Sequence, residues 1–248
     1  MYDPLETDKS YSELVLILNE CKKRDVPICI IGGWATYFYV NENYHRAFGR
    51  DYMGSRDIDI FFDPRKQSEF AEVVENLGFK KDGFHFRYEK IYNRETKKVI
   101  SIEDSKKEHM YNLMYIFLDL FSNEKTEIIS SWNDLEPLKA ISFSTINGFI
   151  VADIDTLVAL KCTALFYRDK SDKENKDAID LYALLVYSEK KIVSTESLVK
   201  AIEKILGRTD LLLVIAQYVL LDYGKQNIVE FTLNSKLKEL TNKGGLNF

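Results

Sequence analysis

The chain contains few cysteines, prolines and glycines, and it lacks a long apolar run. Its 248 residues include 3 Cys, 4 Pro and 11 Gly. Cys21, Cys29 and Cys162 are scattered through apolar stretches, which argues against a disulfide framework or a zinc site and predicts buried thiols in a reducing compartment. The longest candidate for a membrane span, 211–221, falls well short of the roughly 20 apolar residues that a span requires, so we expect no membrane contact.

A large net charge of either sign is also missing. With 34 Lys and Arg against 39 Asp and Glu, the formal net charge is -5. This balance does not point to nucleic-acid binding, although a local basic cleft would not show in the sum. The first residues lack the basic-then-apolar pattern of a signal peptide, so we expect a cytoplasmic protein. A hydrophobic content of 46% suits a well-buried core.

The spacing of apolar residues changes along the chain. Up to about residue 152, short apolar runs alternate with helix-like stretches, and from Asp153 onward the periodicity is helical to the end. This pattern predicts an α/β fold with a small mixed sheet, followed by an all-helical C-terminal domain. The predicted domains are 1–152 and 153–248.

Local signals place individual elements within this plan. Ser10 and Glu13 resemble a capping box at the start of the first helix, and Asp155 is the expected cap of the first C-terminal helix. The other expectations are a strand over 26–31, a helix over 33–40, a mobile loop over 41–54, and strands over 55–62 and 113–121.

A glycine pair and an aspartate pair are the most informative motifs. Gly32 and Gly33 close an apolar strand and open a helix, and such a turn offers bare backbone N–H groups to phosphates. Asp57 and Asp59 alternate within a predicted strand, which places both carboxylates on one face, roughly 7 Å apart. Such a pair repels itself unless a cation intervenes, and Mg²⁺ prefers these ligands together with substrate phosphates. The combination predicts a metal–nucleotide site.

A third carboxylate follows in a later strand. Asp119 lies inside the apolar run 115–121, where an ionised carboxylate is costly to bury unless a cation accompanies it. Plainer interpretations stay open for all of these residues. The glycines are compatible with an ordinary strand-to-helix turn, the aspartate pair with a solvated edge strand, and Asp119 with a salt-bridged core acid.

In their order along the chain, these residues resemble the DNA polymerase β-type nucleotidyltransferase superfamily, and within it the abortive-infection, AbiE-toxin-like branch. That branch combines a glycine pair and Asp-x-Asp with a downstream helical element reading Lys, then Arg, then Lys-Asp-x-x-Asp. The matching residues here are Gly32-Gly33, Ser55-x-Asp57-x-Asp59, Leu157-Val158-Ala159-Leu160-Lys161, Arg168 and Lys176-Asp177-Ala178-Ile179-Asp180.

The resemblance implies a metal site built from three carboxylates. Asp57 and Asp59 would bridge two Mg²⁺ ions, since two-metal chemistry needs a carboxylate cluster that contacts both ions. Asp119 would be the third ligand, holding the catalytic metal and helping to deprotonate the acceptor.

The resemblance also implies a set of phosphate-binding groups. The backbone at Gly32 and Gly33, together with the Ser55 hydroxyl, would hold the β- and γ-phosphates of the nucleotide. Lys161 and Arg168, seven residues apart, would screen the remaining phosphate charge. Both cations are equally compatible with a solvated helix face, and the segment 176–180 with an N-cap and a surface pair.

The function implied is Mg²⁺-dependent transfer of a nucleoside monophosphate from an NTP, ATP included, to an acceptor hydroxyl. The abortive-infection branch suggests an RNA or protein acceptor and an antitoxin-type protein partner in a toxin–antitoxin setting. Relatives that modify aminoglycosides or lincosamides suggest a small-molecule alcohol instead. The alternative is a catalytically inactive protein that binds a nucleotide or a partner on the same fold.

Overall fold

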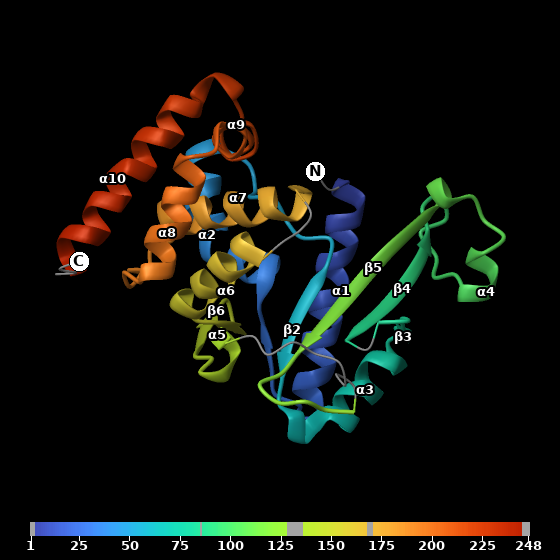
Figure 1. The fold of residues 1–248 in the computed structure, drawn as a ribbon. Helices are drawn as coiled ribbons and strands as arrows, with labels where there is room; N and C mark the ends of the chain where they lie inside the picture. Colours follow the sequence, from blue (N-terminus) through green and yellow to red (C-terminus); the bar gives the residue numbers. More distant parts are fainter. Residues whose placement is uncertain (1–2, 85, 128–135, 168–170, 245–248) are drawn as a thin grey trace. The chain divides into compact units, whose positions relative to one another are not determined.

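The structure, a computed structural model, describes residues 3–84, 86–127, 136–167 and 171–244 (Figure 1). The chain divides into two compact units. The first unit comprises Met1–Trp34 and Met53–Val151, and the second comprises Ala35–Tyr52 and Ala152–Phe248. The two-domain division expected from the sequence stays a prediction.

The first unit contains the sheet and the helices that pack on it. Its strands are β1 (Ile28–Ile30), β2 (Ile58–Phe62), β3 (Lys80–Lys81), β4 (Arg87–Asn93), β5 (Leu113–Phe121), β6 (Phe143–Ile146) and β7 (Phe149–Ala152), the last residue of which belongs to the second unit. Its helices are α1 (Pro4–Lys23), α3 (Gln67–Asn76), α4 (Ile102–Ser105) and α5 (Glu136–Lys139), with short 3-10 turns at η1 (Pro64–Lys66) and η2 (Met110–Asn112).

The second unit is helical. Helix α2 (Gly32–Phe48) begins in the first unit and belongs to the second from Ala35 onward. The other helices are α6 (Ile154–Tyr167), α7 (Ser171–Tyr187), α8 (Glu196–Leu206), α9 (Thr209–Tyr218) and α10 (Gln226–Gly244), with a 3-10 turn at η3 (Tyr223–Lys225). The predicted class, an α/β part with a mixed sheet followed by a helical C-terminal part, is confirmed.

The sheet is mixed, with the strand order β3-β4-β5-β2-β1-β7-β6 (Figure 1). Strand β2 runs parallel to β5 and antiparallel to β1, while β4 runs antiparallel to β5. In this register Asp59 lies opposite Asp119, and Asp119 lies opposite Arg87. Three neighbouring strands therefore place one charged residue each in the same row of the sheet.

The two faces of this sheet differ in character. Along β5 the even-numbered side chains are buried on the face that α1 covers, and α1 also contacts α3. The odd-numbered side chains point to the other face, because successive side chains of a strand alternate. Those on the covered face are Met114, Ile116 and Leu118, and those on the other are Tyr115, Phe117 and Asp119.

Helix α1 begins earlier than the predicted capping box. Its N-cap is Asp3, whose side chain accepts a hydrogen bond from the Leu5 backbone N–H, and Pro4 occupies the first turn. An aspartate cap followed by proline is a strong start signal, so Ser10 and Glu13 fall inside the helix and the capping-box prediction was wrong.

Ser10 and Glu13 instead join α1 to the rest of the first unit. The Trp34 indole N–H donates to the Ser10 hydroxyl at 3.0 Å. Lys90 of β4 donates to Glu13 Oε2 at 2.9 Å, and the Tyr92 hydroxyl donates to Glu13 Oε1. Glu13 and Lys90 are both buried, and burial, with Glu13 adding to it, raises the pKa of Tyr92. These buried contacts hold α1 against β4.

The predicted loop over 41–54 is largely helical. Helix α2 continues to Phe48, and Gly49 follows it with a φ of 67°. Tyr44 is buried in the second unit, where its hydroxyl donates to the Val219 carbonyl at 2.9 Å and its ring meets Tyr52 edge-on. Buried aromatic packing thus extends a helix whose polar residues had suggested a loop.

The start of β2 and the cap of α6 also differ from the positions predicted from the sequence. Strand β2 begins at Ile58, so Asp57 lies in a bend one residue before it and not within the strand as expected. Helix α6 is capped by Asp153, which accepts the Thr156 N–H, and the predicted Asp155 cap was wrong.

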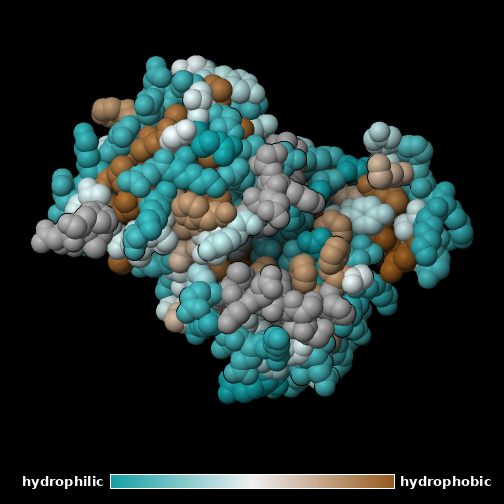
Figure 2. Space-filling view, viewed as in Figure 1, coloured by the Kyte–Doolittle hydropathy of each residue, from teal (hydrophilic) through white to brown (hydrophobic). Residues whose placement is uncertain are grey.

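The predicted burial of Cys21, Cys29 and Cys162 is confirmed, and none of the three forms a disulfide within the described residues. Within the described ranges, no helix is both long and apolar enough to cross a membrane. Figure 2 shows a mainly hydrophilic face with several hydrophobic patches, among them one near the end of β4 and the start of β5 and others over the C-terminal helices.

The Glu13 contacts generate a prediction about stability. Glu13→Gln should lower the free energy of unfolding by about 3 kcal/mol, because it leaves the buried Lys90 ammonium without its carboxylate. The control is Glu196→Gln, which removes an exposed pair with Lys200 and should cost less than about 0.5 kcal/mol. Urea unfolding followed by circular dichroism measures both, and equal effects would contradict a structural role for Glu13.

Candidate functional site

The glycine pair sits where β1 passes into α2, and both glycines are required by close neighbours. Gly32 has a φ of 66°, and a Cβ added there would lie 2.0 Å from Asp59 Oδ2. A Cβ on Gly33 would lie 2.8 Å from the Ser55 hydroxyl oxygen. The Asp59 carboxylate and the Ser55 hydroxyl therefore lie directly against the N-terminus of α2, where the backbone dipole favours negative charge.

The aspartates come from two neighbouring strands. Asp59 of β2 and Asp119 of β5 are register partners, so their Cα atoms are about 4.8 Å apart and their side chains share one face. Asp57 precedes β2 and lies two residues from Asp59 along the chain. The sheet register thus brings Asp59 and Asp119 together, while Asp57 lies just before the strand.

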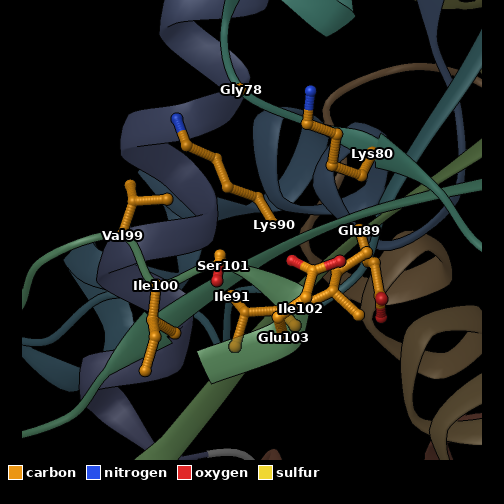
Figure 3. A pocket seen from close by; sticks show the side chains of 10 residues that line it. All are labelled: Gly78, Lys80, Glu89, Lys90, Ile91, Val99, Ile100, Ser101, Ile102 and Glu103. Carbon is orange, nitrogen blue, oxygen red and sulfur yellow. The ribbon is translucent and has the colours of Figure 1, made fainter. Parts of the chain in front are cut away.

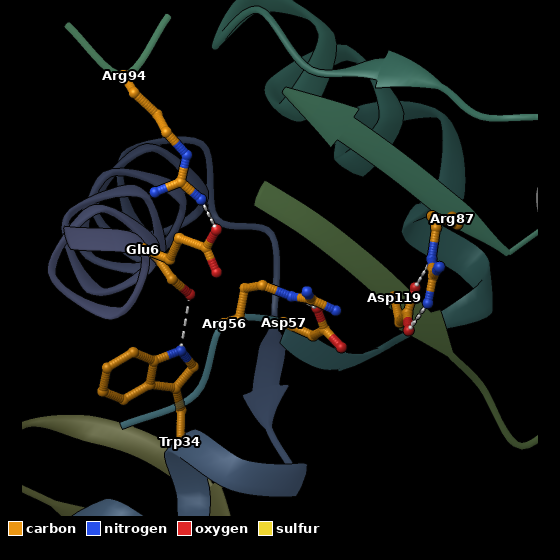
Figure 4. Close-up of polar contacts among 8 residues, drawn as sticks. Glu6, Trp34, Arg56, Asp57, Arg87, Arg94 and Asp119 are labelled. Carbon is orange, nitrogen blue, oxygen red and sulfur yellow. Dashed lines mark hydrogen bonds and ion pairs between the residues drawn. The ribbon is translucent and has the colours of Figure 1, made fainter. Parts of the chain in front are cut away.

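Two of these acids are paired with arginines in the same unit (Figure 4). Arg87 of β4 holds Asp119 in a two-pronged contact, with Nε donating to Oδ1 at 2.6 Å and Nη2 donating to Oδ2 at 2.7 Å. Arg56 donates from Nε to Asp57 Oδ1 at 3.3 Å. The hydrogen bonds that Arg87 donates to Asp119 raise the pKa of Arg87, so this guanidinium stays charged.

As the side chains stand, no three Asp, Glu, His or Cys residues of the described chain form a group that could hold a metal ion. A cation site at this position is therefore inferred from the carboxylate ligands and from the strand register that pairs Asp59 with Asp119. Carboxylate oxygens are the ligands of hard divalent ions, and Asp59 and Asp119 occupy adjacent positions on one face. The half-buried guanidinium of Arg87, paired with Asp119, shows that this position already takes a positive charge.

Lys161, expected at the nucleotide phosphates, is buried within the second unit. Its ammonium lies 3.0 Å from Asp177 Oδ1 and 2.7 Å from Asp180 Oδ2. Lys176 also contacts Asp180, at 2.5 Å, and the Tyr52 hydroxyl donates to Asp180 at 2.9 Å. These residues form a nearly charge-balanced cluster, so neither a solvated face for Lys161 nor a surface pair for 176–180 describes them.

The cluster shifts the pKa of each charged member. Burial opposes the charge of Lys161, but the carboxylates of Asp180 and Asp177 outweigh it and raise the pKa of Lys161. Burial likewise opposes the Asp180 carboxylate, yet the two lysines lower the pKa of Asp180. For Lys176 burial prevails and lowers the pKa. These contacts are those of a structural ion-pair network, and a phosphate role for Lys161 stays a prediction.

Arg168, the second predicted phosphate ligand, lies outside the described residues.

The side chains of the first unit form cavities, which lie apart from the three aspartates. One of about 390 Å³ has Lys80, Lys90 and Ile100 among its lining residues (Figure 3). Another, of about 580 Å³, has Phe61 and Phe143 among its lining residues. Neither cavity is lined by Asp59 or Asp119, the two register partners that form the carboxylate row, or by Asp57.

The sequence did not reveal Arg87 as a residue of this site. It lies in a run of alternating aromatic residues, and only the antiparallel register of β4 against β5 places it beside Asp119. The available signal was weak, consisting of a basic residue in an otherwise half-apolar strand. Phe117, whose ring centroid lies 4.6 Å from the Arg87 guanidinium, likewise resembled ordinary core packing.

No protein-family model matches the sequence, and no curated protein matches it. Solved structures do. The crystal structure of JHP933 from Helicobacter pylori is 13% identical, with a TM-score of 0.52 over 96% of this chain and 94% of that one. The crystal structure of an antigenic nucleotidyltransferase-like protein from Paracoccidioides brasiliensis is 15% identical, with a TM-score of 0.51 over 86% and 94%.

These similarities define the class of structure: the fold is nucleotidyltransferase-like. A further match, to the solution structure of the antibiotic-resistance factor ANT(2'')-Ia, is 14% identical with a TM-score of 0.39 over 96% and 97% of the two chains. That match is too loose to carry an argument. At these identities the comparisons show the fold alone, and the abortive-infection branch stays a prediction.

The contact between Gly32 and Asp59 generates a prediction. Gly32→Ala should lower stability by at least about 2 kcal/mol more than Gly49→Ala, because its Cβ must displace the Asp59 carboxylate. Gly49 is a matched control, since its φ of 67° is nearly the same and a Cβ there meets nothing within 4 Å. Thermal and urea unfolding of both variants measure the difference, and equal losses would contradict the close packing.

The buried cluster of the second unit generates another. Asp180→Asn should cost about 3 kcal/mol at pH 7, because both lysines lose their shared carboxylate. The pKa of Asp180 lies below its ordinary 3.8 in the folded state, so its stabilisation is present above that value and is lost as the pH falls through the lower folded pKa. The gap between wild type and variant should narrow at about pH 3.

The control for this variant is Asp210→Asn, which removes an exposed partner of Arg208. It should change stability by less than about 0.5 kcal/mol at either pH. A gap for Asp180→Asn that widens on acidification would contradict the proposed ionisation of the cluster.

Proposed function

We propose that the chain is a metal-dependent nucleotidyltransferase that moves a nucleoside monophosphate from an NTP to an acceptor hydroxyl. The observation that carries this proposal is the row formed by Asp59 and Asp119 beside the N-terminus of α2. This row would combine acidic metal ligands with a backbone site for phosphate, on central strands of a sheet in a nucleotidyltransferase-like fold. The resemblance of the sequence to the abortive-infection branch supports the same reading.

The row and the groups beside it each have a role in this proposal. Asp57, Asp59 and Asp119 would hold Mg²⁺, which supplies charge neutralisation for the triphosphate and the transferred group. The N–H groups at Gly32 and Gly33 would bind phosphate oxygens at the positive end of α2. The proposed nucleotide site therefore lies on the β1 side of the carboxylates.

The Ser55 hydroxyl, packed against Gly33, would donate a further hydrogen bond to the triphosphate. The acceptor hydroxyl oxygen would form a bond to the α-phosphorus, while the bond to the bridging oxygen breaks and pyrophosphate leaves. The hydroxyl proton would pass to Asp119. The acceptor, whether RNA, protein or a small-molecule alcohol, would approach from the β4 side of Asp119, opposite the glycines.

A second candidate function has an observation of its own. Arg87 holds both carboxylate oxygens of Asp119, which is the geometry expected of a structural ion pair. A protein in which this pair is permanent would bind a nucleotide or a partner without transferring anything. The two candidates differ in whether nucleotide binding leads to pyrophosphate release.

The first experiment measures the thermal unfolding of wild type with Mg²⁺ and each of ATP, GTP, CTP and UTP. A nucleotide at about 100 times its Kd should stabilise the folded state by about 2.7 kcal/mol. We expect this shift to require Mg²⁺ and to vanish in the Asp57→Ala/Asp59→Ala double variant. Asp63→Ala, at the far end of β2, should keep it.

The nucleotide that shifts wild type is then supplied with an α-phosphate label to cell extract fractionated into RNA, protein and small molecules. Transfer of label with release of pyrophosphate supports the enzyme. Binding without any pyrophosphate release supports the second candidate. Absence of a shift with every nucleotide at millimolar concentration would contradict the enzyme and nucleotide binding alike, and would leave partner binding as the remaining form of the second candidate.

A further inference from the structure

Two arginine–aspartate pairs flank one aromatic ring on the face that carries the carboxylate row. The Arg87 guanidinium lies 4.6 Å from the centroid of the Phe117 ring, and the Arg56 guanidinium lies 5.7 Å from it. Arg87 is bound to Asp119 and Arg56 to Asp57 (Figure 4). Two of the three proposed metal ligands are thus each bound to a cation that Phe117 supports.

The strand pattern explains why Phe117 has this position. It lies two residues before Asp119 on β5, so both side chains point to the same face. An aromatic face attracts a guanidinium through its quadrupole, and this attraction grows where water is scarce. Phe117 therefore holds Arg87 close to Asp119, and Arg87 is preorganised as its counter-ion.

The two pairs differ in strength. Arg87 makes two charge-assisted hydrogen bonds of 2.6 and 2.7 Å, and its side chain and that of Asp119 are 17% and 11% exposed. Arg56 makes one longer contact of 3.3 Å, and its side chain is 37% exposed. Two short bonds with little solvent are stronger than one long bond in water. Arg87 should therefore compete with a metal more effectively than Arg56.

The Arg87 guanidinium uses a lone pair on each carboxylate oxygen of Asp119, and its positive charge would repel a divalent ion bound to the same carboxylate. We propose that Arg87, and more weakly Arg56, act as resident counter-cations that compete with the metal for the aspartates and so set the metal affinity of the site. This inference rests on the proposed function, because it takes the aspartates to be metal ligands. It adds a regulatory role for two arginines that the catalytic scheme does not use.

The test is titration with Mn²⁺ alone, without nucleotide, followed by isothermal calorimetry and by the electron paramagnetic resonance of free Mn²⁺. Arg87→Ala should bind Mn²⁺ about tenfold more tightly than wild type, since both the competing hydrogen bonds and a nearby positive charge are removed. Arg56→Ala should show a smaller gain, of about threefold.

The matched control is Arg65→Ala. Arg65 also forms a two-pronged pair with an aspartate, Asp63, but its side chain is 88% exposed and Asp63 lies outside the carboxylate row. Its loss should leave Mn²⁺ affinity unchanged. Adding Asp119→Asn to Arg87→Ala should abolish the gain, which shows that the gain acts through that carboxylate.

Arg87→Lys guards against loss of folding in the alanine variant. Lysine keeps the charge but cannot make the two-pronged contact, so this variant should bind Mn²⁺ with an affinity between those of wild type and Arg87→Ala. Circular dichroism of each variant establishes that it is folded before titration.

The outcomes separate this inference from the proposed function. If wild type binds Mn²⁺ and Arg87→Ala binds it equally or more weakly, the competition is overturned while the metal site stands. If neither wild type nor any folded arginine variant binds Mn²⁺ at millimolar concentration, the metal site itself is overturned, and the competition with it. Tighter binding in the order Arg87→Ala, Arg56→Ala, Arg65→Ala supports the inference.

Discussion

The parallel register of β2 against β5 is the constraint on which the candidate site depends. It places Asp59 opposite Asp119, two carboxylates that would repel each other at this spacing without a compensating positive charge. The protein supplies that charge from two sources, the N-terminus of α2 at Gly32 and the guanidinium of Arg87. A shift of this register by one residue would turn Asp119 to the covered face and dismantle the site.

The same constraint explains why positive groups gather around the row. The residue at position 32 must lack a Cβ because the Asp59 carboxylate lies against it. Without that side chain, the backbone N–H groups at the start of α2 would be accessible to an anion that accompanies a metal. On the other side, Phe117 holds the arginine that faces Asp119. In the helical unit, by contrast, the charge of Lys161 is balanced by Asp177 and Asp180. These buried ion pairs join α6 to α7.

Local signals in the sequence predicted more of the site than of its surroundings. Gly32, Gly33 and the apolar strand containing Asp119 could be recognised because glycine turns and strand patterns are properties of neighbouring residues. The pairing of Asp119 with Arg87 could not, because it depends on a strand register between residues 32 positions apart. The extension of α2 was missed for a related reason, since the contacts that bury Tyr44 come from a distant helix.

Binding of a metal–nucleotide complex at the Asp59–Asp119 row is the proposal on which the other assignments depend. It is tested most directly by a crystal structure of the protein grown with Mn²⁺ and a non-hydrolysable NTP analogue, with the metal located by anomalous scattering. We expect metal at Asp59 and Asp119, the triphosphate at Gly32 and Gly33, and Arg87 no longer bound to Asp119. Nucleotide bound elsewhere, with the Arg87–Asp119 pair intact and no metal at the aspartates, would contradict the proposal.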